Sequence, residues 1–228
     1  MRLNPGVIRE LHWHKEAEWA YVLSGEVRVT ALDTEGGSFI DDLKEGDLWY
    51  FPSGHPHSLQ GLGENGTEFL LVFDDGAFSE DSTFLLNEWI EHTPKAVVAE
   101  NFRLPPEIFE SIHEKDKYIF QGQSPQAQYT QGRSSLTHSC TGSVPDSIEE
   151  EKPKAFKKSK HQYTHHMLET PPVEGSGGKA RIVDSKNFPI SKTIAAAHLD
   201  IEPGAMREMH WHPNADEWCV KVGRDLPA

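Results

Sequence analysis

The stretch that decides the fold occurs twice, as Arg9-Glu10-Leu11-His12-Trp13-His14 and as Arg207-Glu208-Met209-His210-Trp211-His212. In each copy a Pro-Gly pair stands two residues before the stretch, at Pro5-Gly6 and at Pro203-Gly204. A Glu-Trp pair soon follows each copy, at Glu18-Trp19 and Glu217-Trp218. A match of this length between distant segments indicates a duplicated domain.

The first copy has the pattern of a metal site. Side chains alternate between the two faces of a strand, so His12 and His14 project to the same side with Cα atoms roughly 7 Å apart. Glu18 shares their parity, and His57, which follows two Gly-containing turns, is the candidate for a fourth ligand. Three imidazoles and one carboxylate leave open positions on an octahedral ion and suit Mn, Fe, Ni or Zn.

The second copy supplies His210, His212 and Glu217, but no counterpart of His57 follows before Ala228. We therefore expect a second, incomplete metal site with three protein ligands and poor affinity. The first copy begins almost at its Pro-Gly pair, whereas the second has strand-like sequence from Ala180 onward. These features predict a chain shortened at both ends, through an incomplete gene, a truncated isoform or a degenerate copy.

Short strand-like runs separated by turn residues dominate the first half. Glu18 to Leu23 and Glu26 to Leu32 flank Ser24-Gly25, which predicts a hairpin. Further runs cover residues 47–52, 57–62 and 68–73. This spacing favours an all-β protein, either an antiparallel sandwich or a barrel.

Four segments are predicted from the change of composition along the chain. Residues 1–92 form a first barrel that lacks its leading strands, and residues 93–120 have apolar spacing compatible with helices. Residues 121–178 are rich in Gln, Ser, Thr, Pro and Gly, which predicts a partly disordered linker. Residues 179–228 begin a second barrel. In the linker, His161, His165 and His166 are expected to be exposed.

The spacing of glycines around the ligands resembles a known family. Gly6, His12, His14, Glu18 and Gly25 match the first motif of the cupins, a double-stranded β-helix or jelly-roll barrel, and Gly46, Pro52, Gly54 and His57 match the second. Residues 9–19 and 46–54 resemble the bicupin oxalate decarboxylases in particular. The resemblance implies a Mn(II) enzyme that splits oxalate into formate and carbon dioxide, with dioxygen as co-catalyst.

The same resemblance implies roles for two further residues. Arg9 would hold the substrate carboxylate through a charge-assisted bond, and Arg207 is its counterpart in the second copy. Strict alternation sends Arg9 to the wrong face, so a bend near Glu10 is required. Ser79-Glu80-Asp81-Ser82-Thr83 resembles a mobile lid, and Glu80 would donate the proton that completes formate. A surface ion pair is the alternative for Arg9, and a solvated loop position is the alternative for Glu80.

The net charge and the hydropathy of the chain limit the kinds of partner that it is expected to bind. A formal net charge of −14 repels phosphate backbones, so nucleic acid is not expected as a partner. No apolar run has the length of a membrane span. Oxalate is the implied partner, and a homo-oligomer remains open.

Oxalate oxidase and a non-catalytic metal-binding cupin fragment remain the alternative functions. The protein would be secreted if fungal in type and cytoplasmic if bacterial, and no choice is made.

Overall fold

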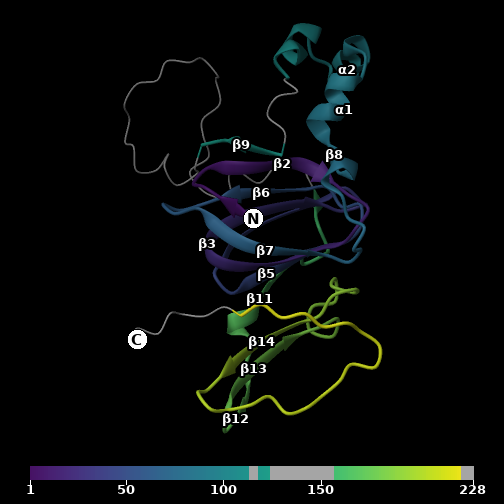
Figure 1. Cartoon of the computed structure of the whole chain (residues 1–228). Coiled ribbons are helices and arrows are strands. Elements are labelled where there is room, and N and C mark those ends of the chain that lie inside the picture. The colour runs from purple at the N-terminus through teal and green to yellow at the C-terminus, as the bar shows by residue number, and fades with distance from the viewer. Residues whose placement is uncertain (113–117, 124–156, 222–228) are drawn as a thin grey trace.

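The computed structural model describes residues 1–112, 118–123 and 157–221. A curled sheet of eleven strands forms the main body (Figure 1). Its strands are β1 (Arg2–Leu3), β2 (Val7–Trp13), β3 (Glu18–Leu32), β4 (Gly37–Lys44), β5 (Asp47–Phe51), β6 (His57–Gly61), β7 (Thr67–Phe73), β8 (Phe84–Leu85), β9 (Ile119–Gln121), β10 (Lys157–Lys158) and β11 (Thr164–His166). The prediction of an all-β architecture for this part of the chain is confirmed.

Strand β3 organises the barrel because it belongs to both of its walls. Its first part pairs with β5 and β7, and its second part pairs with β4 and β6. The register shifts between Val22 and Ser24, and Gly25 has a φ of 76°. The predicted hairpin at Ser24-Gly25 is therefore wrong. The glycine bends one continuous strand from one wall to the other, as glycines at barrel corners do.

The core lies between the two walls and consists of alternating inward side chains. Its members are buried residues of β1 to β7 together with Tyr163, among them Val22, Val29, Trp49, Phe51, Leu59 and Phe69. Burial of this apolar area is the main favourable term in folding. Strand β4 was missed from the sequence because Asp41, Asp42 and Lys44 obscure its alternation.

The segment that follows the barrel is helical, with bounds that differ from the expected 93–120. It contains the short turn η1 (Glu80–Ser82), helix α1 (Leu86–His92), helix α2 (Lys95–Phe102) and the turn η2 (Pro106–Ser111). Helix α1 thus begins inside the stretch expected to be barrel. Both helices lie beyond one edge of the sheet, next to β8 (Figure 1).

The predicted linker contains ordered structure in its described part. Strand β10 pairs in parallel with β4, and β11 pairs antiparallel with β5. Residues 157–166 therefore extend the barrel, which corrects the linker expectation for this stretch. His161 is exposed as expected, whereas His165 and His166 are only half-exposed. Residues 124–156 lie outside the described part.

A second, three-stranded sheet follows the turn η3 (Met167–Glu169). It consists of β12 (Val173–Gly175), β13 (Gly178–Val183) and β14 (Ala196–Ile201). Val183 and Phe188 pack with Met167 against Leu48 and Tyr50 of the barrel wall. Within the described residues, no helix has the length and apolar character needed to cross a membrane.

Candidate metal centre

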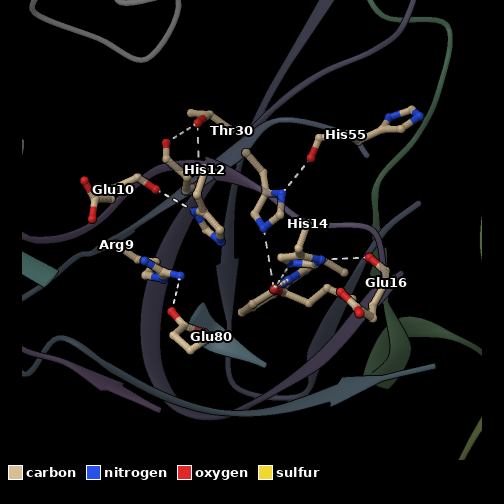
Figure 2. A network of polar contacts seen from close by, with 12 residues as sticks. Arg9, Glu10, His12, His14, Glu16, Thr30, His55 and Glu80 are labelled. Atoms are coloured by element: carbon tan, nitrogen blue, oxygen red, sulfur yellow. Dashed lines mark hydrogen bonds and ion pairs between the residues drawn. The ribbon is translucent and has the colours of Figure 1, made fainter. Parts of the chain in front are cut away.

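Four buried side chains converge inside the barrel. His12 is in β2, His14 follows the end of that strand, Glu18 begins β3 and His57 begins β6. One ligand atom from each of the four lies within 4.8 Å of the others. Antiparallel pairing places His12 directly opposite His57. Figure 2 shows His12 and His14 side by side in this interior.

The three imidazoles are held in one tautomer by backbone carbonyl groups. The Nδ1 of His12 donates to the carbonyl of Glu10 at 2.6 Å, and the Nδ1 of His14 donates to that of Glu16 at 2.8 Å. The Nδ1 of His57 donates to the carbonyl of His55 at 2.8 Å. Because each Nδ1 carries the hydrogen of the neutral ring, each Nε2 presents its lone pair to the centre. This arrangement fixes tautomer and orientation as metal sites require.

Glu18 carries the negative charge of the cluster. Its Oε2 lies 3.3 Å from the Nε2 of His14 and 3.5 Å from that of His57. Burial alone would raise the pKa of Glu18, but the close approach of the His14 and His57 imidazoles holds that pKa well below its usual range. The carboxyl group is thus an anion in a dry interior, where it needs a cationic partner.

The histidines differ in their affinity for protons. Burial lowers the pKa of His12 to about 2, and the nearby His57 and Arg9 act in the same direction. Burial also disfavours the charged form of His14, yet the Glu18 carboxylate outweighs it and the pKa of His14 is raised. The Nε2 of His57 has no hydrogen-bond partner although it is buried. Three nitrogen donors, one of which is the unpartnered Nε2 of His57, and one carboxylate anion together fit a divalent metal ion.

Trp49 orients the Glu18 carboxylate by binding the oxygen that does not face the histidines. Its indole Nε1 donates to the Glu18 Oε1 at 2.9 Å, which leaves Oε2 for the centre of the cluster. The indole is fully buried in the core. The sequence analysis did not identify Trp49, because the alternation of side chains in β5 does not tell which of its aromatic residues will contact Glu18.

Arg9 and Glu80 lie beside the four ligands. The β2–β6 register shifts between Arg9 and His12, and Arg9 and Glu10 are consecutive buried residues. The required bend is thus present. The Nη2 of Arg9 and the Oε1 of Glu80 are 2.5 Å apart, with the Arg9 side chain 4% exposed and that of Glu80 40% exposed. Both line one cavity together with His12, His14 and Glu18, and Figure 2 shows their ion pair.

The second predicted cluster forms without a barrel around it. Ligand atoms of His210, His212 and Glu217 lie within 4.8 Å of one another, but all three residues are exposed. Arg207 is exposed as well. Within the described residues no strand follows Ile201. Of the two histidines, only His210 is held by a backbone carbonyl, that of Glu208. The cluster therefore lacks the burial and the fixed ring orientations of the first site.

Fold and site together define a metal-binding cupin. The cupin family model (Cupin) matches residues 1–109 and 165–222, and the chain belongs to this family. Oxalate decarboxylase OxdC of Bacillus subtilis is 53% identical over 218 residues, which are 96% of this chain and 51% of OxdC. A probable oxalate decarboxylase of Arthroderma benhamiae is 40% identical over 96% of this chain and 49% of its own length.

A solved structure of the Bacillus subtilis enzyme agrees with this relationship. It was described in work on the Mn(II) centres of that protein and has a TM-score of 0.80 and 52% identity to this chain. The match covers 94% of this chain and 52% of the solved one. The chain is thus a homologue of oxalate decarboxylase OxdC and spans about half the length of the curated relatives it matches.

Proposed function

We propose that the chain binds Mn(II) at His12, His14, Glu18 and His57 and converts oxalate into formate and carbon dioxide. The observation that carries this proposal is the cavity itself. It brings a buried guanidinium, that of Arg9, and a half-exposed carboxyl group, that of Glu80, to the side of the four ligands. The relationship to oxalate decarboxylases of twice the length supports it.

A bound Mn(II) ion would supply Lewis acidity and one-electron chemistry toward oxalate, with dioxygen as co-catalyst. The protein contributes four ligands whose orientation is fixed by the surrounding residues. The carbonyl groups behind the three Nδ1 atoms prevent the rings from turning away. The open side of the cavity, where Arg9 and Glu80 lie, is left for a small dianion.

Arg9 is suited to bind and orient that dianion. Its guanidinium is almost completely buried, and a charge-assisted bond to a carboxylate is strongest where water is excluded. A planar guanidinium can also engage both oxygens of one carboxylate. We assign to Arg9 the binding of the oxalate carboxylate that becomes formate after the carbon–carbon bond breaks.

Glu80 is suited to supply a proton. The overall reaction takes one oxalate dianion and one proton to one formate and one carbon dioxide, with no net oxidation. The carbon that loses its neighbour must receive that proton. Glu80 lies in η1, whose first turn is capped by the Ser79 hydroxyl, and it reaches the cavity while still partly open to solvent. It can therefore be reprotonated between turnovers.

The test is the fate of oxalate in a Glu80→Gln variant, with Asp81→Asn in the same turn as the matched control. We expect Glu80→Gln to lose formate by about 10²-fold or more, and the residual turnover to consume dioxygen and yield two carbon dioxide molecules with hydrogen peroxide. Asp81→Asn should retain the formate yield. An unchanged formate yield in Glu80→Gln would show that the proton comes from elsewhere.

A further inference from the structure

The Arg9 guanidinium is held by Glu80 on one side and by Tyr118 on the other. Tyr118 is not part of the metal site. Opposite Glu80, the Nη1 of Arg9 donates to the backbone carbonyl of Tyr118 at 3.2 Å. The guanidinium carbon also lies 5.4 Å from the centroid of the Tyr118 ring. Tyr118 therefore contacts the guanidinium both through its carbonyl oxygen and through its ring face, two contacts that favour a cation.

Tyr118 does not adopt its conformation freely. Its φ is 73°, in the left-handed region that a bulky residue enters only at a cost in free energy. Such a conformation persists where the surroundings impose it. The residue stands directly before β9, whose three residues pair with Val7, Ile8 and Arg9 of β2.

Two hydrogen bonds join Glu10 to the backbone of Tyr118. The Oε1 of Glu10 accepts a hydrogen bond from the Tyr118 N–H at 2.6 Å, and the Glu10 N–H donates to the Tyr118 carbonyl at 3.2 Å. The Nδ2 of Asn87 donates to the Oε2 of Glu10 at 3.4 Å. Glu10 is 3% exposed, and its carboxyl group is directed away from His12 and His14 in Figure 2.

We infer that Glu10 is a positioning residue. Its side chain fixes the Tyr118 backbone, and Tyr118 in turn fixes the guanidinium of Arg9 in the lining of the metal cavity. This inference rests on the proposed function, because Arg9 matters to catalysis only if it binds oxalate. The Glu10 backbone carbonyl accepts from the His12 Nδ1, and a side-chain substitution leaves that carbonyl in place. The Glu10 side chain bonds to Tyr118 and Asn87 and does not line the cavity, so its effect on Arg9 passes through Tyr118.

The test compares Glu10→Ala with Glu10→Gln in the Mn-loaded chain. Gln keeps an oxygen that can accept from the Tyr118 N–H, whereas Ala removes it. We expect Glu10→Ala to raise the KM for oxalate roughly tenfold with a smaller change in kcat, and Glu10→Gln to stay within about twofold of the parent chain. If Glu10→Ala does not fold, Glu10→Asp, which withdraws the carboxylate by one methylene, replaces it.

A second measurement does not depend on turnover. Phenylglyoxal modification of Arg9, followed by peptide mass mapping, reports how firmly the guanidinium is held. It should be about tenfold faster in Glu10→Ala and unchanged in Glu10→Gln. If the parent chain makes no formate, the proposed function fails, while this rate still tests the positioning of Arg9.

Asp33→Ala is the matched control. Asp33 is a buried carboxylate remote from the cavity, and it accepts backbone N–H groups of Glu35 and Gly37. Its loss should lower thermal stability without changing the KM or the Arg9 modification rate. The inference is overturned if Glu10→Ala behaves like Asp33→Ala, with lower stability alone, or if Glu10→Gln is as impaired as Glu10→Ala.

Discussion

At the scale of single residues, the metal centre depends on groups that stand behind its ligands. Three backbone carbonyls fix the histidine tautomers, and Trp49 fixes Glu18. Such outer partners commonly change metal affinity by one to two orders of magnitude when they are removed. The direction in which each ligand points is therefore a property of its neighbours as much as of its own position.

Replacement of Trp49 by Phe tests this dependence. The change removes the Nε1–H donor to Glu18, so we expect the dissociation constant for Mn(II) to rise about 10- to 100-fold, measured by competition with a chelating dye. Trp19→Phe is the matched control, because Trp19 is a buried tryptophan of the other apolar cluster. Equal Mn(II) affinities in the two variants would contradict the role given to the Trp49 hydrogen bond.

His165 links pH to stability away from the metal. Burial lowers its pKa, with His166 acting in the same direction, and its Nε2 lies 2.9 Å from the Thr170 hydroxyl. The unfolded chain, with a histidine pKa of about 6.5, then takes up protons before the folded chain does. Stability is consequently lost as the pH falls below that value and toward the lower folded pKa.

We therefore expect His165→Gln to lose less stability than the parent chain between pH 7.5 and pH 5.5, as measured by urea denaturation midpoints. The exposed His92 of α1 serves as the comparison, and His92→Gln should follow the parent chain. Identical pH dependence in His165→Gln and the parent would rule out this contribution.

At the scale of elements, the site exists because β3 passes from one barrel wall to the other. Its first residue is the ligand Glu18, and its last third pairs with β6, which carries His57. A Cβ at Gly25 would overlap the carbonyl oxygen of Gly66, and the φ of 76° is unfavourable for any other residue. The bend thus depends on the absence of a side chain.

Gly25→Ala should lower the free energy of unfolding by about 3 kcal/mol or more, because steric overlap adds to left-handed strain. Gly36→Ala is the matched control: its φ is 77°, but nothing lies within 4 Å of the added Cβ, so about 1 kcal/mol is expected. Denaturant unfolding of both variants measures the difference. Similar losses would show that overlap with Gly66 is relieved.

The sequence predicted the parts of this architecture that depend on local pattern. Parity placed His12, His14 and Glu18 on one face, and glycine spacing pointed to a cupin with His57 as the fourth ligand. The pattern could not separate a hairpin from a bend at Ser24-Gly25, since both use a glycine. The contacts of Trp49, and those of Glu10 with Tyr118, were also out of reach, because they join strands that are distant in the chain.

At the scale of the whole molecule, the two copies of the repeated stretch have unequal surroundings. The first lies within a curled sheet with a buried core, and the second follows a three-stranded sheet with His210, His212 and Glu217 exposed. The strands β10 and β11 extend the first barrel, and Val183 and Phe188 pack against its wall. The chain is accordingly expected to hold one firmly bound metal ion.

The central claim is that this first site alone makes a working centre for oxalate. The most direct measurement is formate produced per oxalate consumed by the Mn-loaded chain in air near pH 5, with bound Mn counted by mass spectrometry on the same sample. We predict about one tightly bound Mn(II) per chain and one formate for each oxalate. One bound Mn(II) with no formate would contradict it and would make the chain a metal-binding cupin without this activity.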